Sequence, residues 1–558
     1  MQEKAEGWDY LVAEVLKARY LRKGETSWED ICGRVARAIA GDETEFQEFR
    51  ELMVRKLFLP SSPVLMNAGT ELGQLSSCFV VPVGDSVEEI FGAVKTAALI
   101  QKTGGGTGFN FSEIRPKGSP ALCVDGVASG PVSFIGLFNA ATEVIKQFGK
   151  RRGANIGILD VSHDDVISFI RAKKTEGNLN NFNLSVMVPD SFMELVETGM
   201  LETVWNKKTG VKVEEIFAEI VEGIWNNGEP GLLFYDRINR DNFTPELGEI
   251  TAVNPCGEEP LLSFESCNLG SLNLSNFIIN RELDWKFLKA GIKKAVRFLD
   301  NCIDKNAYPV PEIEKATKRT RKIGLGVMGF HDMLLKLGLP YDSKGALQVG
   351  ERLMKFVTTT AIEESRKLAA EKGSFPEHAS SSWSFPMRNA ALTAIAPTGT
   401  ISILAGCSAG IEPVFSWVYR RTRTIDNEFM LVHPLFEAHF KPNLSKNDYE
   451  QMLDHIYTQG TLQDFKAEIP LKRKEKQLFR SALDINWKAH IDMQATFQRH
   501  CHAGISKTIN MPAETEREEI RKALIYAWKQ GLKGLTIYRT KSREQVVYNL
   551  KKPEASEP

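Results

Sequence analysis

Apolar positions that recur every three or four residues predict several helices along this chain. In the first 58 residues, Ile31, Val35 and Ile39 follow this spacing, and Ser27 with Asp30 forms a helix N-cap signal. The same periodicity predicts amphipathic helices in three later stretches: residues 284–305, 345–373 and 518–530. Gly84, Asp85 and Ser86 precede a further periodic run and are typical of a helix cap.

Short apolar runs between the helices predict β-strands. The clearest are residues 76–81, residues 322–329 and a run that ends at Pro397. Prolines at 60 and 63 end the N-terminal helical segment, which we place at residues 1–58. Helices that alternate with short apolar strands are typical of an α/β protein, and we expect that fold class here.

Composition excludes several classes of protein. The 558 residues are 42% hydrophobic and 25% charged, and the net charge is −1, so no field for nucleic acid or a membrane surface is expected. The N-terminus has no apolar signal-peptide core, and no run of 18 apolar residues exists. Eight cysteines without a C-x-x-C pair are typical neither of a disulfide scaffold nor of a structural zinc site. We expect a reducing cytoplasmic location.

Candidate chemistry is concentrated in the stretch Asn254-Pro255-Cys256-Gly257-Glu258. Proline and glycine disfavour a helix here, so the sequence predicts an extended loop. In an extended chain, alternate residues point to one side roughly 6–7 Å apart, which would place an amide, a thiol and a carboxylate on one face. A buried structural cysteine is the alternative, but a thiol beside titratable groups is a functional candidate.

A resemblance to a known family rests on this stretch and on four other blocks. These are Ser76–Val81, Lys102–Gly108, Asn389–Phe415 and Ile505–Pro512. Together they resemble ribonucleotide reductase large chains from roughly Arg19 to Arg543, and most of all the adenosylcobalamin-dependent class II enzymes. The resemblance implies a ten-stranded α/β barrel, built from two five-stranded parallel halves set antiparallel, with the Cys256 loop threaded through its middle. The barrel would span residues 59–540, followed by a loose tail at 541–558, and no ATP cone is expected in residues 1–58.

The resemblance also implies a role for each group near the loop. Cys256 would carry a thiyl radical, Glu258 would act as general base, and Asn254 would hold the substrate hydroxyls. Cys78 and Cys267 would form the reducing pair that becomes a disulfide. The implied reaction is reduction of ribonucleotides, with ribonucleoside diphosphates as the expected substrates, to 2′-deoxyribonucleotides.

Substrate and effector contacts are carried over in the same way. The implied substrate-binding residues are Ser62, Ser77, Gly106, Thr398, Gly399, Thr400 and Ile401. Local sequence alone leaves residues 398–400 equally open as a phosphate-binding helix start or a plain N-cap. The implied effector-binding residues are Asp85, Ser86, Lys150, Arg151 and Asn180. Asp85 and Ser86 are equally explained as a cap, and Lys150 and Arg151 as a solvated turn.

The radical source separates the classes of the family. No C-terminal Gly-Tyr motif is present, and the place of the tyrosine pair of class I chains holds only Tyr538. We therefore expect adenosylcobalamin as cofactor. Expected partners are a ribonucleotide, a dNTP effector, a thioredoxin- or glutaredoxin-type reductant and a second copy of the chain, without nucleic acid or membrane. His500, Cys501 and His502 cannot converge on one ion, and no metal is expected.

No cysteine follows Cys501, although family members usually end in a cysteine pair that re-reduces the site. Either the sequence is part of a longer chain, or another protein supplies those thiols. Three rival functions stay open: a class I-type subunit that needs a metal-bearing partner, a non-catalytic nucleotide-binding regulator, and a general thiol–disulfide oxidoreductase. The intact set Asn254, Cys256 and Glu258 argues against the regulator, and the lack of C-x-x-C argues against the oxidoreductase.

Overall fold

The N-terminal segment is helical, as predicted. The structure, a computed structural model, describes residues 8–120, 126–147, 151–175, 177–424, 427–466 and 471–542. The first elements are α1 (Trp8–Val15), the π-type turn η1 (Leu16–Tyr20), α2 (Trp28–Ile39) and α3 (Glu43–Val54). Ser27 and Asp30 close a capping box at the start of α2. The short strand β1 (Phe58–Pro60) and the helix α4 (Ser62–Asn67) then lead into the sheet.

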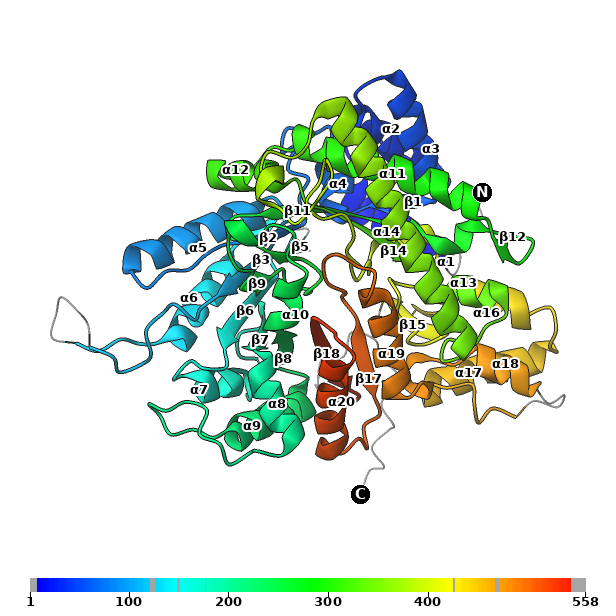
Figure 1. Ribbon diagram of the computed structural model, residues 1–558. Coiled ribbons are helices and arrows are strands. Elements are labelled where there is room, and N and C mark those ends of the chain that lie inside the picture. Colours follow the sequence, from blue (N-terminus) through cyan, green and yellow to red (C-terminus); the bar gives the residue numbers. More distant parts are fainter. Residues whose placement is uncertain are drawn as a thin grey trace.

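Five parallel strands form the first half of the sheet. They pair in the order β2 (Cys78–Val80), β3 (Gly106–Asn110), β6 (Asn155–Asp160), β7 (Phe182–Val188) and β8 (Gly231–Phe234). The connecting helices are α5 (Val87–Lys102), α6 (Pro131–Val144), α7 (Val166–Ile170), α8 (Asp190–Thr198) and α9 (Val213–Asn227). Figure 1 shows these helices along the outer side of the strands, in blue to green. Their apolar faces and the strands form one core cluster.

The second half runs in the opposite direction. Its strands are β11 (Ser266–Asn273), β14 (Ile323–Met328), β17 (Thr508–Met511) and β18 (Gly534–Arg539). β11 and β14 are parallel, as are β17 and β18. Residues 391–395 lie between these two pairs and join them through the parallel bridges Leu325–Thr393 and Ile395–Ile505. The run that was expected to be a strand ending at Pro397 is therefore bridged over a few residues only.

Two antiparallel contacts join the halves. β11 pairs with β2 on one side, and β18 pairs with β8 on the other. Counting the bridged segment, the pairings pass through ten strands and return to their start, which is the expected arrangement of two five-stranded halves. The helices of the second half are α11 (Trp285–Lys305), α12 (Pro311–Thr320), α13 (Phe330–Leu337), α14 (Lys344–Lys372), α19 (Trp487–Gln498) and α20 (Arg517–Lys529).

A separate lobe is inserted in the second half of the sheet, between residues 391–395 and β17, and is yellow and orange in Figure 1. It contains β15 (Val418–Thr424), β16 (Asn427–Val432), α16 (Pro434–Phe440), α17 (Lys446–Gln459) and α18 (Arg473–Leu478). Its core is built around Trp417, which is fully buried and stacks on Phe436. The remaining short elements are β4 (Lys146–Gln147), β5 (Arg151–Arg152), α10 (Tyr235–Arg240), β12 (Ile278–Ile279), β13 (Glu282–Leu283) and α15 (Ile401–Ala405).

The strands β9 (Ala252–Val253) and β10 (Pro260–Leu261) form a hairpin that fills the space between the two halves. On the first half, a Cβ atom at Gly108 would lie 1.8 Å from the Val253 carbonyl oxygen. On the second half, Gly504 donates a hydrogen bond of 2.7 Å to the Glu258 carbonyl oxygen. The absence of side chains at these two glycines therefore lets the hairpin lie against both walls.

Gly108→Ala is expected to lower the free energy of unfolding by about 3 kcal/mol or more, because the new methyl group overlaps a backbone oxygen that cannot rotate away. Urea unfolding followed by circular dichroism measures the change. Gly33→Ala in α2 is the matched control: no heavy atom lies within 4 Å of its new Cβ, so a gain of up to about 1 kcal/mol is expected. Equal midpoints for Gly108→Ala and the unsubstituted protein would contradict the hairpin packing.

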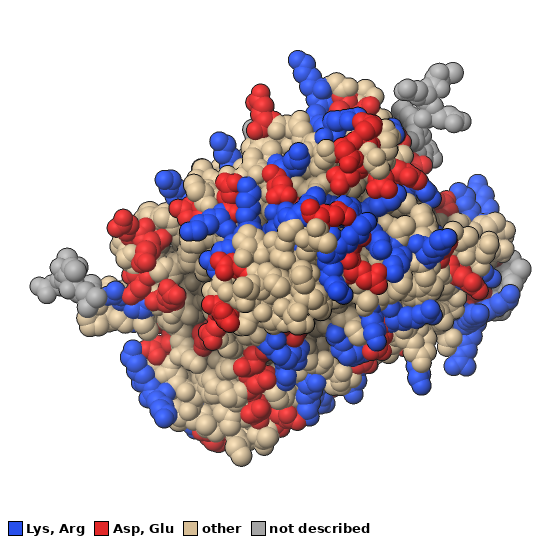
Figure 2. Space-filling view, turned by 45° about the horizontal axis from the view of Figure 1, so that its top comes forward, with Lys and Arg blue, Asp and Glu red and all other residues tan. Residues whose placement is uncertain are grey.

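Charge on the surface is mixed. Figure 2 shows Lys and Arg side chains interspersed with Asp and Glu over the face that it presents. This face therefore offers no extended field of one sign. Among the described residues, none of the helices combines the length and the apolarity that a membrane span requires.

Candidate active site

The tip of the hairpin is a tight turn, so the expected extended loop is wrong. Gly257 donates to the Asn254 carbonyl at 2.9 Å and has a φ of 79°, in the left-handed region. The Asn254 side-chain oxygen accepts from the Glu259 amide at 2.9 Å, which closes the turn. Alternation to one face holds only for extended backbone. As a result, Asn254 and Glu258 are buried inside the barrel, whereas Cys256 is exposed at the tip.

Cys78 and Cys267 lie directly opposite each other where β2 pairs with β11. Both are free thiols and both are buried. Opposite residues of an antiparallel pair have Cβ atoms about 4.5–5.5 Å apart, and a disulfide needs about 3.5–4.5 Å. A small approach of the two strands is therefore enough to join the two sulfurs.

The hairpin tip brings the remaining groups to this thiol pair. Asn254 Nδ2 donates to Cys78 Sγ at 3.0 Å, and the Cys78 thiol lies 4.0 Å from Glu258 Oε1. Gly106, which pairs with Cys78 in the sheet, lies under the ring of Pro255. The Cys256 thiol is close enough to contribute to the raised pKa of Cys78. The structure thus gathers Asn254, Cys256, Glu258 and the two opposed thiols in one place.

Burial sets the protonation of these groups. It raises the pKa of Cys78 and of Cys267 well above the usual value of a thiol. It also raises the pKa of Glu258 to about 7, against a hydrogen bond from Asn254 that lowers it. Among the described residues, Glu258 Oε2 has no hydrogen-bond partner. The reduced pair therefore holds its protons at neutral pH, while Glu258 can gain or lose one.

The predicted substrate residues lie along one hydrogen-bonded line beside the N-terminal helices. Ser77 donates to Ser61 at 2.6 Å, and the next residue, Ser62, shares a bond of 2.7 Å with the Tyr20 hydroxyl. Arg19, adjacent to Tyr20, donates to Thr400 Oγ1 at 3.1 Å. The line therefore runs from the thiol pair on β2 to the turn at residues 398–400.

That turn has an unusual backbone. Thr398 has a φ of 52°, and its hydroxyl accepts a hydrogen bond of 2.8 Å from the Gly410 amide. Gly399 is exposed, Thr400 is half-buried and Ile401 is buried at the first position of α15. Thr400 makes no side-chain cap, because its hydroxyl binds Arg19 instead. Gly106, the last predicted substrate residue, contacts the hairpin rather than this turn.

Among the described residues, the predicted effector positions lie at different places on the chain's surface. Asp85 binds the Arg115 amide at 2.8 Å and its guanidinium at 2.6 Å, and Ser86 caps α5 in a capping box. Lys150 lies outside the described residues, and only the backbone of Arg151 is described. The neighbouring Gly153 contacts Gln101 at the far end of α5, a helix of 16 residues or ~24 Å. Asn180 is exposed in the turn before β7.

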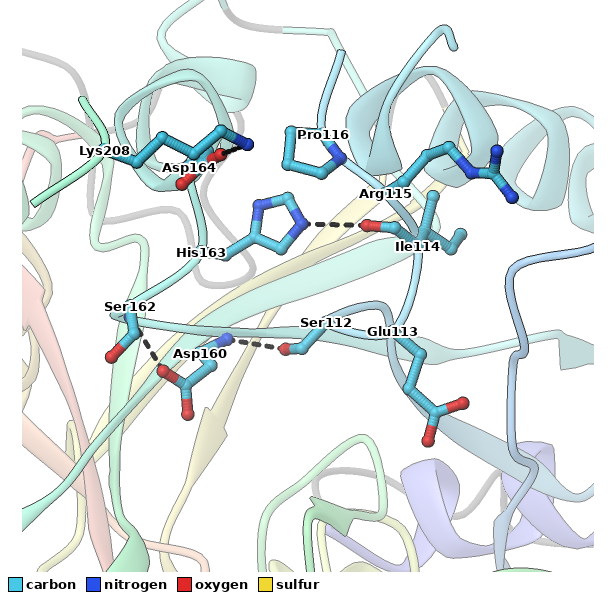
Figure 3. Close-up of a pocket in the computed structure, with 10 residues that line it drawn as sticks. All are labelled: Ser112, Glu113, Ile114, Arg115, Pro116, Asp160, Ser162, His163, Asp164 and Lys208. Atoms are coloured by element: carbon cyan, nitrogen blue, oxygen red, sulfur yellow. Dashed lines mark hydrogen bonds and ion pairs between the residues drawn. The ribbon is translucent and has the colours of Figure 1, made fainter. Parts of the chain in front are cut away.

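A cavity of about 540 Å³ opens beside Asp85, at the ends of β3 and β6. In Figure 3 the His163 ring points across it to the Ile114 carbonyl, and Lys208 pairs with Asp164 at its side. The Asp165 amide donates to His163 Nδ1, so this imidazole is a neutral Nε2–H tautomer. The Arg115 side chain, which holds Asp85, points away from the cavity.

Sequence reasoning missed four residues of this region. Tyr20 and Ser61 were not assigned, although they bind predicted substrate residues. Asn183, which donates to the Pro255 carbonyl at 2.9 Å, holds the hairpin tip from β7. Glu259 was not assigned a role, yet it is buried beside the site. The only available signal was the carboxyl doublet at 258 and 259.

Known proteins share this arrangement over most of the chain. The ribonucleotide reductase barrel domain matches residues 76–387 and 384–538, and the all-alpha domain of the same enzymes matches residues 7–73. The chain belongs to the ribonucleotide reductase family. Its match to the barrel domain includes Cys78, Cys267 and the hairpin that carries Cys256.

Individual relatives in the ribonucleotide reductase family agree. A vitamin B12-dependent ribonucleoside-diphosphate reductase of Thermoplasma acidophilum is 46% identical over 91% of this chain and 67% of its own length. An enzyme of the same description from Mycobacterium tuberculosis is 41% identical over 97% of this chain and 79% of its own. The solved class Id ribonucleotide reductase alpha subunit of Actinobacillus ureae superposes with a TM-score of 0.80, at 25% identity, over 96% of this chain and 99% of that one.

Proposed function

We propose that this chain reduces ribonucleoside diphosphates to 2′-deoxyribonucleotides, with a thiyl radical at Cys256 and adenosylcobalamin as the source of that radical. The observation that carries the proposal is the exposed Cys256 thiol beside two opposed, buried thiols and a buried carboxyl. A nucleotide-binding regulator needs none of these sulfurs. The names and the 41–46% identity of the two vitamin B12-dependent relatives favour this cofactor over a separate metal subunit.

The proposal gives each group one step. A Cys256 thiyl takes the hydrogen from C3′ of the ribose, and Glu258 accepts the proton of the 3′-hydroxyl. Asn254, held by Cys78 and by the Glu259 amide, orients the sugar oxygens. The 2′-hydroxyl then leaves as water with a proton from the thiol pair. Cys78 and Cys267 supply two electrons and join, and Cys256 returns the hydrogen to C3′.

The residues present fit the cofactor in one respect that can be tested. Cys256 is the exposed group of an otherwise buried site, so its sulfur would be open to the group that supplies the radical. Adenosylcobalamin, when bound, supplies the radical through its cobalt–carbon bond.

The decisive assay uses the purified chain alone with adenosylcobalamin, a ribonucleoside diphosphate and dithiothreitol. Deoxyribonucleotide in amounts above one per chain is expected, and none is expected when the cofactor is omitted. Activity that depends instead on a second, metal-bearing subunit would favour the class I alternative. Nucleotide binding without any reduction under either condition would favour the regulator.

We propose that the substrate diphosphate binds at the turn of residues 398–400 and that the sugar lies toward Ser62 and Ser77. The support is the hydrogen-bonded line that connects these residues, with the Arg19 guanidinium beside Thr400. The exposed Gly399 leaves backbone amides free of side-chain cover at this turn.

We further propose a homodimer in which a dNTP effector lies between the chains. Asp85 and the antiparallel hairpin strands β4 and β5 occupy opposite ends of α5. A two-fold axis across α5 and α6 would set Asp85 of one chain against this hairpin of a second copy. The same surface exposes apolar side chains: Val87 is 67% exposed, Phe91 53% and Val144 83%.

Phe91→Lys is expected to raise the dimer dissociation constant at least about tenfold, because it places a charge in an apolar contact. Sedimentation velocity over a range of protein concentrations measures the shift. Met200→Lys, at an equally exposed apolar residue after α8, is the matched control and should leave the dissociation constant unchanged. Equal dimer dissociation constants for the two variants would show that α5 is not part of the interface.

Re-reduction of the site by a thioredoxin- or glutaredoxin-type protein is part of the proposal, since the thiol pair must be restored after each turnover. A reducing, cytoplasmic location is part of the proposal too, because the thiol pair must return to its reduced form. We also propose the division into a helical segment (1–58), a barrel (59–540) and a tail (541–558). Its support is that the first strand of the sheet, β1, begins at Phe58.

A further inference from the structure

Two consecutive carboxyls reach the thiol pair from the hairpin. Glu258 lies on the side of Cys78. Glu259, the next residue, points the other way and lies over the pairing of β11 with β14. A Cβ atom added to Gly324 would lie 2.3 Å from Glu259 Oε1 and 2.3 Å from Leu269 Cδ2. Gly324 thus leaves room for this carboxyl.

The carboxyl of Glu259 lies beside the second thiol. Leu269 pairs with Gly324, and Cys267 is two residues before Leu269 on the same strand. Alternate residues of a strand share a face, so Cys267 and Leu269 point to the same side of β11. The Glu259 carboxyl lies close enough to the Cys267 thiol for each group to shift the pKa of the other. The hydrogen bonds of this thiol go to the Asn268 and Lys322 carbonyls, at 3.6 and 3.8 Å. Each sulfur of the pair therefore has a carboxyl of its own.

Glu259 is buried, and its Oε1 has no hydrogen-bond partner among the described residues. The nearest cation, Lys322, is bound to Glu265 Oε2 at 2.7 Å. Burial raises the pKa of Glu259 to about 8, opposed by the nearby Cys267 thiol and by Lys322 and helped by the charges of Glu258 and Glu265. At neutral pH the carboxyl therefore carries a proton.

We propose that Glu259 is the proton donor and acceptor of Cys267, and that it protonates this sulfur when the Cys78–Cys267 disulfide is reduced. The assignment rests on the proposed function, in which these two sulfurs are oxidised once in each turnover. Cys78 is the more accessible of the two, 3% exposed against 0% for Cys267, and lies on the side of the exposed Cys256. The incoming thiol therefore attacks Cys78, and Cys267 is the leaving group.

Reduction of the disulfide then takes place in two thiol exchanges. A thiolate of the external dithiol forms a bond to Cys78 Sγ, and the disulfide breaks with its electron pair on Cys267 Sγ. Glu259 gives its proton to that sulfur and regains one from water. The second thiol of the reductant then displaces Cys78, which takes up the proton that this thiol releases. The reductant leaves as a disulfide, and both protein thiols are restored.

The test follows disulfide reduction without substrate or cofactor, so that it is independent of ribonucleotide reduction. The disulfide is formed in the full chain with diamide and reduced by dithiothreitol from about pH 6 to about pH 9, a range that brackets the titration of an acid tuned to neutral pH. Labelled peptides that contain Cys78 and Cys267 report the rate. Each rate is divided by the rate at which dithiothreitol reduces oxidised glutathione at the same pH. This ratio cancels the pH dependence that comes from the ionisation of dithiothreitol itself.

Glu259→Gln keeps the shape of the side chain but carries no transferable proton, and Glu259→Asp keeps a carboxyl. At neutral pH, Glu259→Gln is expected to slow the corrected rate at least about tenfold, the lower end of general acid catalysis. The unsubstituted protein should slow as the pH rises through the titration of Glu259. Glu259→Asp should keep this dependence, and Glu259→Gln should lack it.

An unchanged rate for Glu259→Gln would overturn the assignment, as would a slower rate with the original pH dependence, which marks a structural effect. Thermal unfolding curves of both variants are recorded as a control, to check that each variant is folded. Failure of the proposed function would look different. Neither the unsubstituted chain nor any variant would then make deoxyribonucleotide with adenosylcobalamin, whereas the disulfide experiment would still report on Glu259.

Discussion

Cys256→Ser is expected to abolish deoxyribonucleotide formation, with a loss of at least about 10³-fold, as for removal of a reacting group in other enzymes. A hydroxyl does not yield its hydrogen to form a radical as a thiol does. Every later step needs the C3′ hydrogen to be removed first, so even one product per chain should be absent. Rapid-quench single-turnover assays with adenosylcobalamin and radiolabelled diphosphate measure this first event.

Cys32→Ala serves as the matched control for that variant. Cys32 is fully buried in α2, among the N-terminal helices, and its thiol takes no part in the thiol cluster. Its loss should leave the rate unchanged apart from a small decrease in stability. Many dithiol-dependent turnovers by Cys256→Ser would refute a radical at this sulfur, and with it the proposed function.

Periodicity predicted the long helices well because their apolar faces repeat over many turns. The predicted helix at 284–305 is α11, that at 345–373 is α14 and that at 518–530 is α20, each within one residue at either end. The strand expected to end at Pro397 formed over fewer residues than predicted. Residues 391–395 make two parallel bridges and backbone hydrogen bonds to β14 and to residues 503–506, and the regular pairing ends before Pro397.

The site was predictable in its members but not in its shape. Residue types identified Asn254, Cys256 and Glu258, whereas the backbone conformation of Gly257, which turns the loop, is not visible in the sequence. The pairing of Cys78 with Cys267 depends on strand register between distant segments, so only the family resemblance suggested it.

The effector residues show a different limit of sequence reasoning. Asp85 and Ser86 precede α5, whereas Gly153, next to the predicted positions 150 and 151, contacts the far end of this helix. Their proposed meeting place involves a second copy, which no pattern within one chain describes. The role of Glu259 was likewise hidden, because only the register of the hairpin decides which carboxyl of the doublet faces which thiol.

Cys78→Ser and Cys267→Ser are expected to show a different defect from Cys256→Ser. The C3′ hydrogen can still be removed, because Cys256 and Glu258 remain in place. The two electrons for C2′ come from both sulfurs together, so a chain that lacks either one cannot complete a normal cycle. At most one event per chain is expected, and that event should release base from the damaged nucleotide instead of making deoxyribonucleotide.

The measurement is the ratio of free base to deoxyribonucleotide per chain, with and without excess dithiothreitol. In both variants added dithiol should fail to raise product above one per chain, because no disulfide forms for it to reduce. Cys501→Ala, at a buried thiol whose Sγ binds the Thr393 carbonyl, should retain multiple turnovers. Sustained deoxyribonucleotide synthesis by Cys78→Ser or by Cys267→Ser would show that the reducing electrons come from elsewhere, and that the close pairing of β2 with β11 serves structure alone.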